Sequence, residues 1–333
     1  MKRSFVATSA LGAFCAGVLI SSGASALPFR IGDVFAGVGN GVIKEFSPAG
    51  VLYQTLTMTC AGCSTSETTG MAFDSSGNLY ATAFEANAVE KFDNNGAVIG
   101  TFGSGYNLHP ESIVIDGTNN VMYIGQADGT RNVLKLNLST GALLQSLALA
   151  TGPRGTDWID LASDLKTLHY TSEGNLVRAF DVSTSTQLPN FATLPTSPSY
   201  AHRILSDGGE LVANSSEVDH LDSAGAVAKT YALPTGGSFF FALNLDPDGT
   251  DFWTATFAGE VFEVNIATGA IDEMWNAGLV GASLAGLSVF GEICTTCGPV
   301  GAPEPSALSL FGSALIGLLA LYGLRRWRSG NLV

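Results

Sequence analysis

Apolar and polar positions alternate in short runs along most of the chain, and Gly, Asn and Asp separate the runs. This alternation with such breaks predicts β-strands joined by tight turns. One recurring unit is an apolar strand ending in an acid, a polar turn and a second strand, as in MAFDSSGNLYAT from Met71 and LNLDPDGTDFWTAT from Leu243. A second unit places a turn ending in Gly between two strands, as in VEKFDNNGAVIGTF and VFEVNIATGAIDEM.

The turns of the second unit recur at a nearly constant period. Their positions are Gly50, Gly96, Gly141, Thr186, Gly225 and Gly269, separated by 46, 45, 45, 39 and 44 residues. Each period holds four short strands, which is the content of one propeller blade. A β-sandwich also has many short strands, but it does not repeat one four-strand unit at a fixed period. We therefore predict an all-β, six-bladed β-propeller over residues 27–293.

The two ends of this region complete each other. Residues 32–57 supply three strands without an inner one, and residues 284–290 supply a single inner strand. Joined, they make one composite blade that closes the ring without an exposed sheet edge. The same closure predicts that the chain leaves the propeller beside the place where it starts.

The turn and strand motifs FDSSGNLYAT and VEKFDNNG resemble those of NHL-type and streptogramin-lyase-like propellers, and more distantly gluconolactonase-type ones. The resemblance covers about residues 32–292. It implies the fold and leaves the activity open, because the shared residues belong to turns and core.

The N-terminus predicts export. Lys2 and Arg3 precede an apolar run, and Ala24 and Ala26 form a small-x-small cleavage site, so residues 1–26 are expected to be a signal peptide. The alternative is an N-terminal membrane anchor, for which the run is short. Residues 27–302 then carry 10 basic and 28 acidic side chains, a net charge of 10 − 28 = −18. Such a surface repels phosphate backbones and makes nucleic acid a poor partner.

Four cysteines form two C-x-x-C pairs, Cys60 with Cys63 and Cys294 with Cys297. Two such pairs are typical of zinc sites. Export instead favours disulfides, and the predicted topology puts the pairs at opposite ends of the ring. We expect the local disulfides Cys60–Cys63 and Cys294–Cys297, with cross-pairing, zinc or a redox-active dithiol as the alternatives.

Aligning the predicted inner strands places candidate ligand residues at the mouth of the central channel. Glu111 and Asp157 fall in one ring, and Trp158 and His202 fall in the next. The carboxylates and the imidazole suit a divalent cation, and the indole suits a sugar or another flat ligand. The alternative is that these residues line a wet channel and hold no cofactor. No nucleophile elbow, phosphate loop or H-E-x-x-H motif occurs, so no catalytic residue is assigned.

The C-terminus carries a triplet, an apolar run and a basic cluster. Residues 306–324 contain no charge and are long enough for one transmembrane helix, after a Cys/Gly/Pro linker at 294–302. The cluster of Arg325, Arg326 and Arg328 puts the C-terminus in the cytoplasm and the propeller outside.

Pro303-Glu304-Pro305, the apolar helix and the arginines together resemble the PEP-CTERM sorting signal of Gram-negative bacteria, over residues 303–328. The resemblance implies recognition by exosortase, a membrane protease-transpeptidase, and release toward the cell surface and its extracellular polysaccharide. The leading hypothesis is therefore a membrane-tethered, then processed, binding or structural module, first at the inner membrane with its propeller in the periplasm. The alternative is a secreted, metal-dependent enzyme of lactonase or lyase type.

Overall fold

The structure, a computed structural model, describes residues 28–292. The signal peptide, the second cysteine pair and the sorting segment predicted above lie outside the described residues. Between residues 28 and 292, no helix has the length and apolar character needed to cross a membrane.

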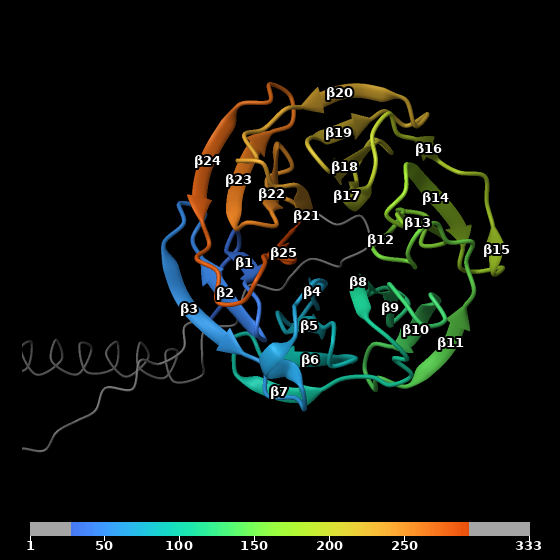
Figure 1. Cartoon of the computed structure of the whole chain (residues 1–333). Coiled ribbons are helices and arrows are strands. Elements are labelled where there is room, and N and C mark those ends of the chain that lie inside the picture. Colours follow the sequence, from blue (N-terminus) through green and yellow to red (C-terminus); the bar gives the residue numbers. More distant parts are fainter. Residues whose placement is uncertain (1–27, 293–333) are drawn as a thin grey trace, which may run out of the picture.

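Six antiparallel sheets surround a common axis, so the protein is a six-bladed β-propeller (Figure 1). The first blade has the order β25-β1-β2-β3, and its strands are β1 (Val34–Gly37), β2 (Val42–Phe46), β3 (Leu52–Thr57) and β25 (Gly286–Val289). The second blade comprises β4 (Met71–Phe73), β5 (Leu79–Ala83), β6 (Ala88–Phe92) and β7 (Val98–Thr101). The third comprises β8 (Pro110–Asp116), β9 (Val121–Gln126), β10 (Val133–Asn137) and β11 (Leu143–Leu147).

The last three blades follow the same plan. The fourth comprises β12 (Ile159–Leu161), β13 (Thr167–Tyr170), β14 (Leu176–Asp181), β15 (Thr186–Gln187) and β16 (Ala192–Thr193). The fifth comprises β17 (Ser199–Ile204), β18 (Glu210–Asn214), β19 (Val218–Leu221) and β20 (Val227–Tyr231). The sixth comprises β21 (Phe240–Leu245), β22 (Asp251–Thr256), β23 (Glu260–Asn265) and β24 (Ile271–Asn276).

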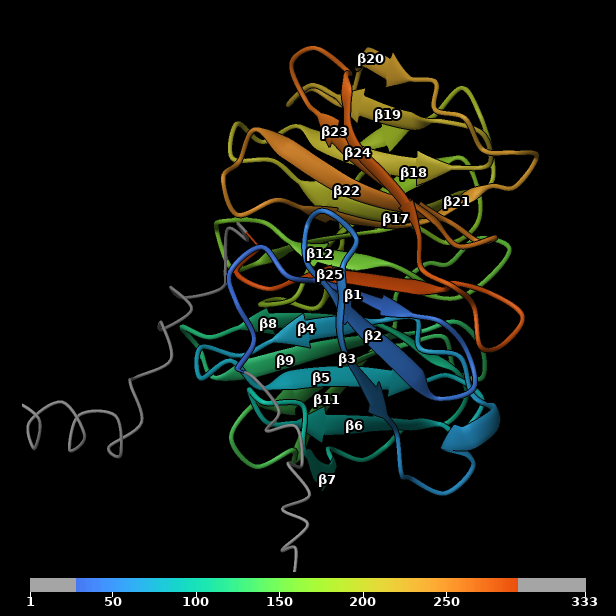
Figure 2. The same cartoon turned by 90° about the vertical axis from the view of Figure 1, so that its left-hand side faces the viewer.

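The composite blade confirms the closure predicted from the sequence. Strand β25 pairs with β1 from Val34↔Val289 to Gly37↔Gly286, so the end of the domain supplies the inner strand of its first blade. The start and the end of the described chain meet, since Gly32 N donates to Phe290 O and the rings of Phe29 and Phe290 lie 5.9 Å apart. Figure 2 shows β25 and β1 side by side.

The fourth blade departs from the repeat because its outer strand is broken. Strands β15 and β16 are two residues each and both pair with β14, with Pro189 between them. Proline has no N–H to donate to a ladder, so a continuous outer strand cannot form there. In this blade the repeated turn position is occupied by Thr186, whereas the other five blades have glycine there.

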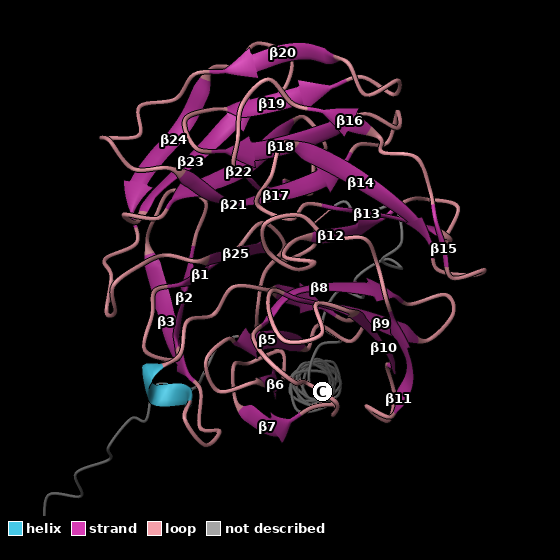
Figure 3. Cartoon of the chain, turned by 45° about the vertical axis from the view of Figure 1, so that its right-hand side comes forward, coloured by secondary structure: helices cyan, strands magenta, loops and turns pink. Residues whose placement is uncertain are grey.

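The six inner strands β4, β8, β12, β17, β21 and β25 run in the same direction along the axis, because each blade repeats one antiparallel order. We call the end where they begin the strand-start end and the opposite one the strand-finish end. The one helical element of residues 28–292 is the short 3₁₀ turn η1 (Cys63–Thr65), which follows β3 (Figure 3). The core fills the spaces between blades, and its largest side chains are Trp, Tyr and Phe.

Candidate functional site

Bulges at the beginnings of three inner strands shape the strand-start end. Glu111 is the extra residue of β8 relative to β9, and Phe241 is the extra residue of β21 relative to β22. A third irregularity lies between Ser199 and His202 in β17, around Tyr200. A bulge turns the side chain of its extra residue away from the regular alternation, and bulges are frequent next to active sites.

Glu111 and Asp157 meet at this end. Both side chains are buried, and their carboxyl groups are close enough for a hydrogen bond between them when one of them carries a proton. Burial, followed by the charge of Glu111, raises the pKa of Asp157 well above its usual range. Burial likewise raises the pKa of Glu111 to about 7, against the lowering effect of Arg154. The two carboxyl groups therefore keep at least one proton near neutral pH.

Arg154 links this pair to a more exposed layer. Its Nη2 donates to Asp128 Oδ2 at 2.8 Å, and its Nη1 lies 3.6 Å from Glu173 Oε1. His109 Nδ1 is also 2.8 Å from Asp128 Oδ2. Burial raises the pKa of Asp128, but the hydrogen bond to His109 and the charge of Arg154 outweigh it and lower that pKa. The network joins loops of the third and fourth blades.

Aromatic rings complete the same end. Phe84 stacks on His109 at 4.2 Å and also lies below the guanidinium of Arg154. Across the axis, the ring of Phe239 stacks on the rings of Tyr200 and Phe257, with centroids 5.3 Å and 4.9 Å apart, respectively. The ring centroid of Phe241 lies 4.9 Å from that of Tyr200 and 5.9 Å from that of Trp158. Phe84, Phe239 and Phe257 are half-buried and keep part of their surface in water.

His202, predicted to share a site with Glu111 and Asp157, contacts a different carboxylate. Its Nδ1 lies 3.2 Å from Glu210 Oε2, and the other oxygen of Glu210 bonds His169 Nδ1. The group lies between the fourth and fifth blades. Burial raises the pKa of Glu210, but the contacts with His169 and His202 outweigh it and bring that pKa down to about 2. Glu210 is therefore an ionised carboxylate held between two imidazoles.

Metal-ligand side chains converge at one other place. Among residues 28–292, Cys60, Cys63 and Glu90 form the one group of three whose ligand atoms all lie within 4.8 Å of one another. Cys60 and Cys63 are joined as a disulfide with their Cα atoms 5.3 Å apart, and Glu90 accepts hydrogen bonds from Thr59. Glu111, Asp157 and His202 do not form such a group.

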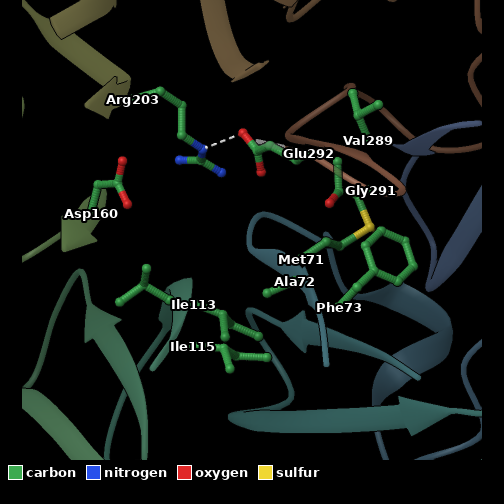
Figure 4. Close-up of a pocket in the computed structure, with 12 residues that line it drawn as sticks. Met71, Ala72, Phe73, Ile113, Ile115, Asp160, Arg203, Val289, Gly291 and Glu292 are labelled. Atoms are coloured by element: carbon green, nitrogen blue, oxygen red, sulfur yellow. Dashed lines mark hydrogen bonds and ion pairs between the residues drawn. The ribbon is translucent and has the colours of Figure 1, made fainter. Parts of the chain in front are cut away.

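The strand-finish end holds a small cavity of about 40 Å³ (Figure 4). Apolar side chains such as Met71, Ile113 and Ile115 line one side, and Arg203 and Glu292 face each other on the other. Arg203 Nε donates to Glu292 Oε1 at 2.9 Å, and Asn244 Nδ2 donates to Glu292 Oε2 at 2.8 Å. Its volume is room for a few waters at most. A wider hollow of about 440 Å³ lies at the same end between the second and third blades, where Asp74, Tyr80 and Asn120 line it.

Sequence reasoning singled out the buried carboxyl pair and Trp158 but not Asp128, Arg154 and Glu173 in the more exposed layer above them. His109, Asp128, Arg154 and Glu173 lie in loops whose lengths differ between blades, so the repeat does not align them. One signal was available. Arg154 is one of only 10 basic residues between positions 27 and 302, and it stands three residues before Asp157.

No protein-family model matches the sequence, and no curated protein matches it. Several solved structures resemble this chain in fold. A chain of a nidogen/laminin complex aligns with a TM-score of 0.61 at 13% identity, over 77% of this chain and 97% of that one. The WD40 propeller domain of Doa1 aligns with a TM-score of 0.58 at 13% identity, over 77% and 81%.

Hydrazine synthase of Kuenenia stuttgartiensis aligns with a TM-score of 0.50 at 14% identity, over 61% of this chain and 64% of that one. The chain thus spans less than two thirds of that protein. At such low identities these likenesses concern the fold alone. Blade topology and structural likeness together identify the chain as a six-bladed β-propeller.

Proposed function

We propose that this protein is exported, tethered to the inner membrane by its C-terminal helix, and then processed by an exosortase-type protease. It then acts as a binding module at the cell surface or in the extracellular polysaccharide matrix. The signal peptide at 1–26, the triplet Pro303-Glu304-Pro305 and the arginines after the apolar run support this route.

The observation that carries the binding role is the composition of the strand-start end. Partly exposed aromatic rings lie beside hydrogen-bonding ionic side chains, with Phe239 and Phe257 on one side of the axis and His109, Asp128 and Arg154 on the other. Flat rings stack on the apolar faces of sugars, and charged groups bond sugar hydroxyls. We infer that a polysaccharide is the ligand of this end.

Binding to polysaccharide purified from the host matrix tests this role, with the full chain in detergent followed by tryptophan fluorescence. Phe257→Ala is expected to weaken binding about tenfold, the loss of one stacked ring. Ile99→Ala, at an exposed position on the outer strand β7, is the matched control and should bind as the wild type does. Equal affinity of the Phe257 variant and the wild type would contradict the assignment.

The route is tested separately by mass spectrometry of the mature protein from its own host. The expected mature chain starts near Leu27 and ends near Pro305. An intact C-terminus in the matrix fraction would contradict exosortase processing.

A metal-dependent lactonase or lyase is the second candidate, because the contact between Glu111 and Asp157 offers paired carboxyl groups. A stoichiometric divalent ion in the purified protein, lost on Glu111→Gln, would favour it. Elemental analysis of both proteins decides between the two candidates.

A further inference from the structure

The carboxyl pair at the strand-start end has unused acceptors. Glu111 Oε2 and both carboxylate oxygens of Asp157 are buried and receive no hydrogen bond from a donor among the described residues. The two carboxyl groups can bond each other, and that bond requires a proton on one of them. A buried carboxylate without a donor is costly, so the pair must either keep this proton or receive a cation.

The surroundings of the pair contain too little positive charge. The charges of Arg154, Glu173 and Asp128 act on Glu111, and His109 binds Asp128. Arg154 already pairs with Asp128 and Glu173. Four acids therefore share one permanent cation, and a second cation would be stabilised here.

An ammonium group fits this place better than a metal ion. A divalent ion needs several oxygen ligands at close range, and within residues 28–292 no third carboxylate or imidazole joins Glu111 and Asp157 within 4.8 Å. The guanidinium of Arg154 would also repel a doubly charged ion about twice as strongly as a singly charged ammonium. An ammonium carries a single charge and three donors, which match the three unpartnered oxygens.

The aromatic rings indicate what carries the ammonium. Tyr200 is close enough to Glu111, Asp157 and Glu173 for their charges to raise the pKa of its phenol to about 12, after the larger effect of burial. Tyr200 also begins the stack that continues through Phe239 to the half-buried Phe257. Tyr200 is therefore the residue that connects the aromatic stack with the carboxyl pair.

We propose that the strand-start end binds an amine-bearing sugar, with the sugar ring against Tyr200, Phe239 and Phe257 and its ammonium group donating to Glu111 and Asp157. The inference rests on the proposed polysaccharide-binding function and names the chemistry that selects the ligand. The neutral N-acetylated form of the same sugar lacks the charge and two of the three donors, so it binds less tightly.

The experiment titrates the full chain in detergent with glucosamine oligomers and with N-acetylglucosamine oligomers of equal length. The wild type is expected to prefer the free amine by about 10- to 100-fold, the range of one hydrogen-bonded charge pair. Glu111→Gln with Asp157→Asn should abolish this preference. Asp272→Asn, an exposed acid on β24, is the control and should keep it.

A second measurement uses the wild-type protein alone, so its result does not depend on whether the double variant folds. At pH 6 the pair is still protonated because burial raises the pKa of both carboxyl groups, so binding of the ammonium should release about one to two protons to the buffer. Calorimetry in two buffers of different ionisation enthalpy measures that release.

The possible outcomes are distinct. Equal affinity for the two oligomers, or binding without proton release, would overturn the inference and leave polysaccharide binding in place. Binding of neither oligomer and of no host polysaccharide would overturn the proposed function as well. Loss of the amine preference on adding Ca²⁺ would show that the pair is a metal site, which also overturns the inference.

Discussion

Two buried acid systems with opposite pH behaviour lie near the axis of the propeller. In one, Glu111 and Asp157 hold a proton at a pH where exposed carboxyl groups are ionised. In the other, Glu210 keeps its charge far below the usual range because His169 and His202 contact it. The difference follows from the partner, since an acid opposes the ionisation of a neighbouring acid and the contacts with His169 and His202 favour the ionisation of Glu210.

Replacement of Glu111 tests the first system. Its folded pKa lies above the unfolded value, so the wild type loses stability as pH rises from about 4.5 through about 7. Glu111→Gln cannot ionise and should lose less over this range, by about 3 kcal/mol. Thermal unfolding between pH 4.5 and 8 measures the difference. Identical pH profiles for the two proteins would contradict the shared proton.

Replacement of Glu210 tests the second system. Its folded pKa lies below the unfolded value, so its stabilisation is complete above about pH 4.5 and is lost as pH falls toward about 2. Glu210→Gln should cost about 3–5 kcal/mol at pH 7, because two buried imidazoles lose their carboxylate. Asp272→Asn serves as the matched control, and denaturant titration followed by circular dichroism gives the values. A variant as stable as the wild type would contradict this role.

At the scale of the element, the beginnings of the inner strands depend on close contact between neighbouring blades. A Cβ on Gly70, just before β4, would overlap the backbone oxygen of Glu111 and lie 2.7 Å from Ser112 Cα. The absence of a side chain at Gly70 therefore lets β8 begin where its bulge can present Glu111. This glycine is required by the approach of another strand and not by its own backbone angles.

Gly70→Ala is accordingly expected to destabilise the protein by about 1–3 kcal/mol through overpacking, and to weaken ligand binding at Glu111. Gly174→Ala is the control, since its nearest neighbour is Pro153 Cδ at 3.4 Å. Urea unfolding of both variants checks the expectation. An equal loss of stability in both variants would contradict the role given to the close contact between Gly70 and β8.

Elements and site residues differ in how far the sequence predicts them. The repeat predicts the blades and the composite closure because strand alternation and turn glycines recur at one period, and even the weak fourth copy matches the broken strand after Asp181. The ring containing Glu111 and Asp157 follows from that alignment. The orientation of His202 does not, because it depends on Glu210, a residue of the next strand. No repeating feature of the sequence predicts the bulge in β17 either.

At the scale of the whole molecule, one carboxylate secures the last strand. Glu292 accepts from Arg203 of the fifth blade and from Asn244 and the backbone N–H of Leu245 in the sixth. The end of β25 is thus bound across the axis as well as along β1. The ring is therefore closed by contacts among the first, fifth and sixth blades.

Glu292→Ala should therefore lower the free energy of unfolding by about 3 kcal/mol, since it leaves the buried Arg203 without its partner. Hydrogen exchange should rise first in β25 and β1, because these strands form the seam of the ring. Mass-resolved exchange of the full chain measures this, with Glu273→Ala on β24 as the control. A uniform rise over all six blades would contradict a local seam.

The course of β25 also determines how the domain carries load. The strand runs along the axis from the strand-start end to Glu292 at the strand-finish end, and its ladder bonds to β1 lie across that direction. A pull on the chain beyond Glu292 acts along the strand, so it strains these bonds together, in shear, and not one after another. The ionic contact to Arg203 takes the force first. The tether proposed above would attach at this end, so tension on it, or its cleavage, would act at the end of the propeller opposite to the rings and charges of the strand-start end.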